Sequence, residues 1–286
     1  MNVIGPVFGV ARKFAKDIPE YLTLLSQKKI DAYEMGFAYG IPEDITDDII
    51  IMAKKFNIIL SCHLPFFINL GNDHTEKNIN YLVSGLKIAE KLNSISVFHL
   101  GFYQNKKYND IKEKIVRDIK ESLEVSGVKK GRLGIETTGK QKAIGTLDEI
   151  IDIVNDIDDN RVFPVIDWSH LFARNSGIFP KTYDDFKQIL IKIEEEQEIT
   201  FNYFHGGGIE HKNGNEVKHI SAKVCKPPLS YLFSVLKDLG YDNFTFIVES
   251  PDSYEDVRWL KEVWDSPENY FEMTKNKEFK TLFDYV

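Results

Sequence analysis

The chain has 286 residues, of which 43% are apolar and 28% charged, and its formal net charge is −8. This composition is typical of a soluble globular protein, and the net charge argues against one that coats nucleic acid electrostatically. The two cysteines, Cys62 and Cys225, exclude a disulfide framework. No signal-peptide pattern opens the chain, and no apolar run approaches the roughly 20 residues of a membrane span. We therefore expect a cytoplasmic protein without a membrane segment.

Eight short runs rich in β-branched and aromatic residues indicate strands that are buried on both faces, as in a parallel sheet. They cover 2–8, 31–38, 58–65, 94–101, 132–138, 162–169, 199–205 and 244–250. Amphipathic segments lie between them and show the helical period, for example 76–93 and 108–127. The segments that begin at Thr146 and Thr182 combine a capping threonine with acidic first-turn residues.

This alternation predicts an α/β protein with a single (β/α)8 TIM barrel, because eight strand–helix units over about 250 residues are the number such a barrel needs. An open doubly wound sheet is the alternative, but no GxGxxG motif opens the first unit. We expect one domain over residues 1–286, with a short helical or loose tail after about residue 268. A monomer is expected.

Polar side chains mark the C-terminal ends of six consecutive predicted strands, which is the end that carries the active site in such barrels. A carboxylate in an apolar strand is costly unless it is paired or coordinates a cation. A single histidine or Glu136 could instead be a structural residue, so it is their convergence that points to a metal site. Imidazole and carboxylate ligands suit zinc, with manganese or iron as alternatives. The candidates are His63, His99, Glu136, Asp167, His170, His205 and Glu249.

Six segments together resemble a known family: "SCHLPFFINL", "VFHLGFY", "LGIETTGK", "VIDWSHLFAR", "FHGGGIE…VKH" and "FIVESP". They are similar to the endonuclease IV family of apurinic/apyrimidinic endonucleases, and most to its archaeal branch within the xylose-isomerase-like TIM barrels. The resemblance runs from about residue 3 to about residue 265. It implies a zinc-dependent hydrolase of base excision repair that cleaves DNA 5′ to abasic sites and binds up to three zinc ions.

The resemblance also implies which residues hold each ion. Glu136 would bridge the first and second ions, which makes it the candidate catalytic residue, and the cations would stabilise the charge that develops on the phosphate. The implied ligands of the first, second and third ions are, in turn, His63, His99 and Glu136; Glu136, Asp167, His205 and Glu249; and His170 and His219.

One departure affects the third ion. Bacterial members carry Asp-x-His in the seventh loop, whereas this chain has Val217 two residues before His219. The neighbouring Lys218 could repel a third cation or take its place, and Glu216 or Glu210 could serve as the ligand instead. We therefore expect two zinc ions and leave the third open.

DNA that contains abasic sites is the expected partner. Lysines follow several predicted strands, and residues 206–227 carry four lysines against two glutamates. Interleaved aromatic residues could wedge against a distorted backbone or an exposed base; the alternative is ordinary surface charge and barrel packing. The basic candidates are Lys106, Lys107, Lys140, Lys142 and Arg174, and the aromatic ones are Phe66, Phe67, Phe102, Tyr103, Trp168 and Phe172.

A divalent-metal-dependent sugar isomerase or epimerase on the same barrel is the main alternative. The quartet of Glu136, Asp167, His205 and Glu249 could hold the single cation that polarises a ketose. His63 and His99 favour the nuclease, because an isomerase needs no second, histidine-rich site beside the quartet. A binding protein that keeps the site without turnover is a third hypothesis.

Overall fold

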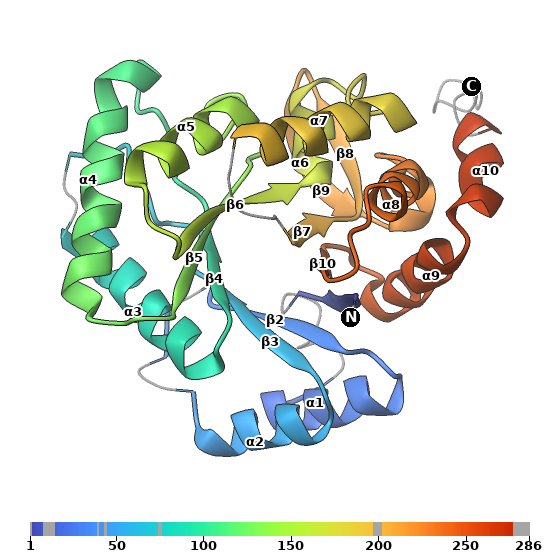
Figure 1. Ribbon diagram of the computed structural model, residues 1–286, viewed down its shortest axis with the longest axis horizontal. Helices are drawn as coiled ribbons and strands as arrows, with labels where there is room; N and C mark the ends of the chain where they lie inside the picture. The colour runs from blue at the N-terminus through green and yellow to red at the C-terminus, as the bar shows by residue number, and fades with distance from the viewer. Residues whose placement is uncertain are drawn as a thin grey trace.

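The computed structural model describes residues 2–7, 15–38, 40–42, 45–73, 76–196 and 202–276. Eight parallel strands form a nearly closed barrel, and helices surround it (Figure 1). Going round the barrel, the strand order is β1-β2-β3-β4-β5-β6-β7-β10, and a bridge between Val7 and Glu34 joins the first two strands. The predicted (β/α)8 TIM barrel is confirmed.

Each barrel strand lies inside or next to one of the predicted runs. The strands are β1 (Val3–Pro6), β2 (Ala32–Gly36), β3 (Ile59–His63), β4 (Ile95–Phe98), β5 (Arg132–Glu136), β6 (Val162–Asp167), β7 (Tyr203–Gly206) and β10 (Thr245–Val248). The first three residues of the predicted run 199–205 lie outside the described residues, as does residue 8 of the first run.

The helices include the four predicted amphipathic segments. They are α1 (Ile18–Gln27), α2 (Asp47–Lys55), α3 (Glu76–Leu92), α4 (Tyr108–Ser126), α5 (Leu147–Ile157), α6 (Trp168–Arg174), α7 (Tyr183–Glu196), α8 (Leu229–Asp238), α9 (Ser253–Asp265) and α10 (Phe271–Asn276). Thr146 caps α5 through a capping box with Glu149, as the sequence predicts. Beyond α9, the described part of the tail consists of the short helix Pro267–Tyr270 and α10.

An antiparallel hairpin interrupts the strand–helix alternation after β7. It consists of β8 (Gly208–Lys212) and β9 (Asn215–Ile220), and both strands contact α6. Asn213 and Gly214 form its turn with positive φ angles of 51° and 70°, which is the Asn-Gly signature of a two-residue hairpin loop. The hairpin was not predicted, although this dipeptide signals it.

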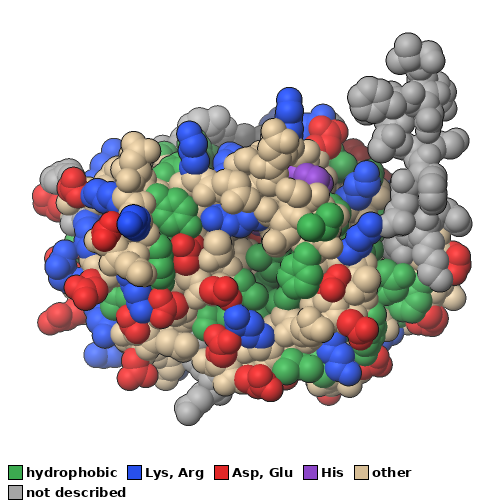
Figure 2. All heavy atoms as spheres, turned by 90° about the horizontal axis from the view of Figure 1, so that it is seen from above, with side chains coloured by type: hydrophobic (Ala, Val, Ile, Leu, Met, Phe, Trp, Pro, Cys, Tyr) green, Lys and Arg blue, Asp and Glu red, His purple; other side chains and the backbone are tan. Residues whose placement is uncertain are grey.

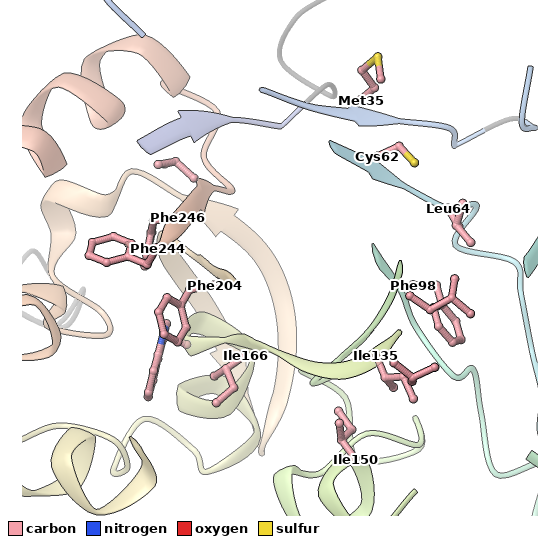
Figure 3. Close-up of a cluster of buried hydrophobic side chains, with 14 of the residues drawn as sticks. Met35, Cys62, Leu64, Phe98, Ile135, Ile150, Ile166, Phe204, Phe244 and Phe246 are labelled. Atoms are coloured by element: carbon pink, nitrogen blue, oxygen red, sulfur yellow. The ribbon is translucent and has the colours of Figure 1, made fainter. Parts of the chain in front are cut away.

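Two apolar layers result from the period-two geometry of the strands. Outward-facing side chains such as Met35, Phe98 and Phe204 pack under the helices, and Figure 3 shows them pointing away from the ring of strands. Inward-facing residues such as Val97 and Val165 form a separate, smaller cluster inside the barrel. Among the described residues, no helix has the length and apolar character needed to cross a membrane.

Candidate metal centre

The same alternation turns the polar candidates inward, because each follows an outward-facing apolar residue. Ile135, Ile166 and Phe204 belong to the outer layer, so Glu136, Asp167 and His205 face the barrel interior. All three acidic and imidazole side chains are fully buried. Cys62, the residue before His63, likewise belongs to the outer layer (Figure 3).

The candidate ligands converge as three adjoining groups at the C-terminal end of the barrel. Within each group, one ligand atom from every residue lies within 4.8 Å of the others. Glu136 is shared by the first two groups, whereas Asp167 and Glu249 are shared by the second and third. The groups are His63, His99 and Glu136; Glu136, Asp167, His205 and Glu249; and Asp167, His170, His219 and Glu249.

Several ligand atoms in these groups lie close together without making hydrogen bonds. Among the described residues, His99 Nε2, Glu136 Oε1, Asp167 Oδ2 and His205 Nδ1 are buried atoms that lack a hydrogen-bond partner. His99 Nε2 nevertheless lies 2.8 Å from a Glu136 oxygen. Buried polar atoms are normally satisfied, so atoms that converge without satisfying one another suit a shared cation. The residues present therefore fit a metal.

Backbone contacts orient two of the imidazoles. His63 Nδ1 lies 2.8 Å from the carbonyl oxygen of Leu64, and His170 Nδ1 lies 2.9 Å from that of Thr137. A carbonyl only accepts, so Nδ1 carries the proton in each neutral ring and Nε2 keeps its lone pair. His63 Nε2 lies 2.9 Å from Glu136 Oε2. Two lone pairs at that distance repel unless a proton or a cation lies between them.

Asp167 has two roles that follow from its place at the end of β6. Its Oδ1 accepts a hydrogen bond of 2.7 Å from the backbone N–H of His170 and so caps α6. Its Oδ2 makes no hydrogen bond to the described residues and faces the ligand groups. The "IDWSH" spacing thus places Asp167 and His170 on the same side of the site.

Glu34 is a functional candidate that the sequence reasoning missed. It is fully buried on β2, and its Oε2 lies 3.0 Å from His205 Nε2 and 2.6 Å from the Tyr203 hydroxyl, which donates to it. His205 therefore donates through Nε2 and presents Nδ1 to Glu136 and Glu249, 3.4 and 3.1 Å away. A carboxylate behind a ligating histidine is common at metal sites. The signal was available, because Glu34 is an acid within an apolar strand.

The electrostatics of the centre follow from burial and close packing of opposite charges. Burial lowers the pKa of His63, but the Glu136 carboxylate outweighs it and raises this pKa to about 9. Burial raises the pKa of Glu136, but the neighbouring His99 and His205 hold it well below its usual range. The protonated imidazoles therefore balance the negative charge of the buried carboxylates. A bound cation would take over this role, because it competes with the protons for the lone pairs of the imidazoles.

A cavity of about 610 Å³ opens above the ligand groups. His63, His99, His170, His219 and Glu249 line its floor, and Phe66, Phe102 and Lys140 are among its other lining residues. This volume lies within the range of small-molecule sites, roughly 300–1,000 Å³. The ligand groups are therefore open to a substrate from one side.

The candidate DNA contacts separate into two sets. Phe66, Phe67 and Phe102 are 65%, 39% and 42% exposed, whereas Trp168 and Phe172 are buried in the fold and cannot reach DNA. The proposed wedge role of these last two is therefore wrong; they are apolar packing residues.

The basic candidates also differ in what they contact. Arg174 donates to the carbonyl oxygens of Lys140 and Ala143 and so holds the loop after β5, instead of facing a partner. Lys106 pairs with Asp73. On the face seen in Figure 2, positive and negative side chains are interspersed.

Comparison with known proteins assigns the family. The family model described as "Xylose isomerase-like TIM barrel" matches residues 23–266. The chain belongs to this family of xylose isomerase-like TIM barrels. This confirms the family resemblance at the level of the xylose isomerase-like barrel.

One sequence relative and two solved structures are similar to this xylose isomerase-like barrel. An uncharacterized protein from Methanocaldococcus jannaschii is 31% identical over 251 residues, which cover 83% of this chain and 88% of the relative. Endonuclease IV from Thermus thermophilus is similar in structure, with a TM-score of 0.68 and 17% identity over 93% of this chain and 99% of the other. D-psicose 3-epimerase from Clostridium cellulolyticum has a TM-score of 0.64 and 14% identity over 96% and 95%. At these identities the two structures share the fold alone.

Proposed function

We propose that this protein is a metal-dependent phosphodiesterase that cleaves DNA 5′ to abasic sites, with zinc as its cation. The observation that carries the proposal is the position of His63 and His99 beside the quartet, with Glu136 common to both groups. A carboxylate shared by two neighbouring ligand groups suits a two-cation centre, and such centres act in phosphodiester hydrolysis.

When bound, the cations would activate water and stabilise negative charge on the phosphate. The chain's own residues determine where this can occur. Glu136 supplies a buried carboxylate to both groups, and Glu34 holds His205 in the orientation that presents Nδ1. Glu136 and Asp167 are fully buried, and the cavity gives water access to the neighbouring ligands that line it, such as His63 and His99.

Exposed aromatic residues at the cavity support a nucleic acid substrate. Phe66 and Phe102 line the cavity with large exposed faces, and such rings stack on bases that have been displaced from a duplex. An abasic site is locally unstacked, so these rings could occupy the gap while the phosphate lies over the ligand groups. Lys140 adds one positive charge at the same opening.

A duplex with one abasic site tests the proposal. The zinc-loaded protein should nick the damaged strand 5′ to the lesion and spare a matched intact duplex. The H99Q variant, which lacks one ligand of the first group, should nick at least about 100-fold more slowly. A protein that carries metal but leaves abasic DNA intact would contradict the proposal.

The second candidate is a sugar isomerase or epimerase that uses only the quartet. It is favoured by the compact second group, in which Glu136 and Glu249 both lie within reach of one cation and could also exchange protons with a ketose. Ketose turnover measured with the same preparation distinguishes the two functions. Turnover that survives in H99Q, without nicking of abasic DNA, would favour the isomerase.

A further inference from the structure

A β-bulge in the hairpin after β7 changes which side chains face the metal centre. Within the hairpin, which the structure describes throughout, Glu210 pairs with Lys218 and His211 pairs with Glu216. Val217 lies between these pairs and has no cross-strand partner. A residue inserted in this way reverses the alternation of the side chains that follow it.

The β8 residues that pair with His219 and Glu216 show which face of the hairpin these two side chains occupy. Ile209 is buried against Phe172 of α6, and the His211 ring lies 5.6 Å from the Phe172 ring, so both face α6. Cross-strand partners share a face of a hairpin. Their partners are His219 and Glu216 respectively. Without the bulge, Glu216 would lie on the face opposite to His219; with it, the two share the side that faces α6.

Contacts between side chains agree with this register. Glu216 Oε2 lies 3.6 Å from His170 Nε2, and the rings of His170 and His219 are 5.3 Å apart. The His170 Nδ1 proton is used by the Thr137 carbonyl, so Nε2 presents a lone pair toward the carboxylate. Two ligands of a tetrahedral zinc ion lie about 3.3–3.5 Å apart, given zinc–ligand distances of about 2.0–2.2 Å.

The neighbouring loop holds Glu216 in place. Its backbone N–H donates to the carbonyl of Gly139 at 2.7 Å, and Gln141 donates to the side chain of Asn215 and to the carbonyl of Gly214. Gly139 is required for this approach, because a Cβ there would lie 2.8 Å from Glu216 Cβ and 2.9 Å from His170 Cδ2. The carboxylate is thus delivered by a fixed backbone, which limits the entropy lost on ligation.

Lys218 and Glu210, which the sequence analysis also considered for the third ion, do not face the metal centre. Lys218 and Glu210 form an exposed pair 3.3 Å apart, with side chains 61% and 50% exposed. Val217 is 58% exposed. Lys218 therefore neither repels nor replaces a cation at the site, and Glu210 is not available as a ligand.

We propose that Glu216, which lies beside the third group without belonging to it, completes that group as a ligand of a third cation, together with His170 and His219 at the rim of the cavity. The bulge at Val217 compensates for the absence of an acid two residues before His219, because it moves the preceding acid onto the ligand face. This inference rests on the metal centre of the proposed function. It concerns how many ions bind and not which substrate is cleaved.

Counting zinc per chain tests the proposal independently of activity. The full-length protein and its variants are stripped with a chelator, reloaded with zinc, desalted and analysed by inductively coupled plasma mass spectrometry. We expect three ions in the wild type and two in E216Q, with the third-ion affinity of E216Q reduced at least about 100-fold, since even outer-shell partners contribute about 10- to 100-fold. E210Q, which removes an exposed acid of the same hairpin, should keep three.

The double variant E216Q/V217D tests the role of the bulge. Because residue 217 faces solvent, an acid there should not restore the third ion. A wild type with only two ions, an E216Q protein with three, or recovery of the third ion in E216Q/V217D would each overturn the proposal. Loss of one ion in E216Q without any DNA cleavage by the wild type would keep this inference and reject the nuclease. Cleavage of abasic DNA by the wild type, together with an unchanged zinc count in E216Q, would keep the nuclease and reject this inference.

Discussion

Glu34 Oε2 lies 3.0 Å from His205 Nε2, and both side chains are completely buried. The same oxygen accepts a hydrogen bond from the Tyr203 hydroxyl, whose oxygen in turn lies 2.6 Å from Ser61 Oγ. A row of hydrogen bonds across the barrel interior thus ends on the imidazole of the second ligand group. Glu34 fixes which nitrogen of His205 faces the candidate cations.

Replacement of Glu34 by Gln should weaken metal binding by about 10- to 100-fold, because the amide can still accept the His205 N–H but no longer supplies a negative charge. The affinity is measured by competition with a chromophoric chelator. The matched control is D118N, which removes another buried acid, paired with Lys114 at 2.7 Å on α4 and outside the ligand groups. Equal losses of zinc affinity in E34Q and D118N would assign Glu34 a purely structural role.

Replacement of Glu136 by Gln should lower the metal content of the first and second groups together, since one carboxylate belongs to both. Cleavage of abasic DNA should then fall by about 100-fold or more. The measurements are metal analysis and single-turnover nicking. A full metal content in E136Q would show that Glu136 is not the shared ligand.

The chelator-treated protein should lose stability as the pH rises. The pKa of His63 is about 9 in the folded protein, against about 6.5 in an unfolded chain. A raised histidine pKa gives stability that is fully present below pH of about 6.5 and is lost as the pH rises through about 9. His170 and His205 also have raised pKa values, because burial is outweighed by the Asp167 carboxylate beside His170 and by the Glu34 carboxylate beside His205, so they add to the trend.

Urea unfolding of the chelator-treated protein at a series of pH values measures this dependence. In H63Q the decline between pH 6.5 and 9 should be shallower, because one of the contributing imidazoles is gone. A free energy of unfolding that increases over this interval would contradict the charge arrangement described for the centre.

Replacement of Phe66 by Ala should weaken binding of abasic DNA by about 10-fold, because stacking of one base on an aromatic ring contributes about 1–3 kcal/mol. Phe66 is 65% exposed, so the fold and the metal content should change little. I51A is the control, since Ile51 is 62% exposed on α2 and does not line the cavity. Fluorescence anisotropy with a labelled abasic duplex measures the effect. Unchanged affinity in F66A would remove the ring from the substrate site.

The barrel and the convergence of its polar residues could be predicted because both depend on short-range patterns. Continuous apolar runs mark strands, and a polar residue at the end of such a run faces the interior when the preceding residue packs outward, as for Ile135 and Glu136. The positions of His63, His99 and Glu249 follow from the same rule. Glu34 also faces the interior by this rule, but it was overlooked because it lies within β2 and not at the end of the strand.

The hairpin after β7 shows where prediction stops. Asn213-Gly214 is a turn signal that sequence reasoning can use. The bulge at Val217 is different, because strand register depends on how Ile209 and His211 pack against α6, and no local pattern in the polar sequence specifies that packing. The orientation of Glu216 and Lys218 depends on this single inserted residue, so it required the structure.

The proposed function depends above all on imidazoles and carboxylates from successive strands sharing a polynuclear cation centre. Crystals of the zinc-loaded protein, with diffraction recorded above and below the zinc absorption edge, reveal such a centre without recourse to activity. We expect separate anomalous peaks between His63, His99 and Glu136 and within the quartet of Glu136, Asp167, His205 and Glu249. A map without peaks at either position, with these side chains bonded only to one another, would refute the shared centre.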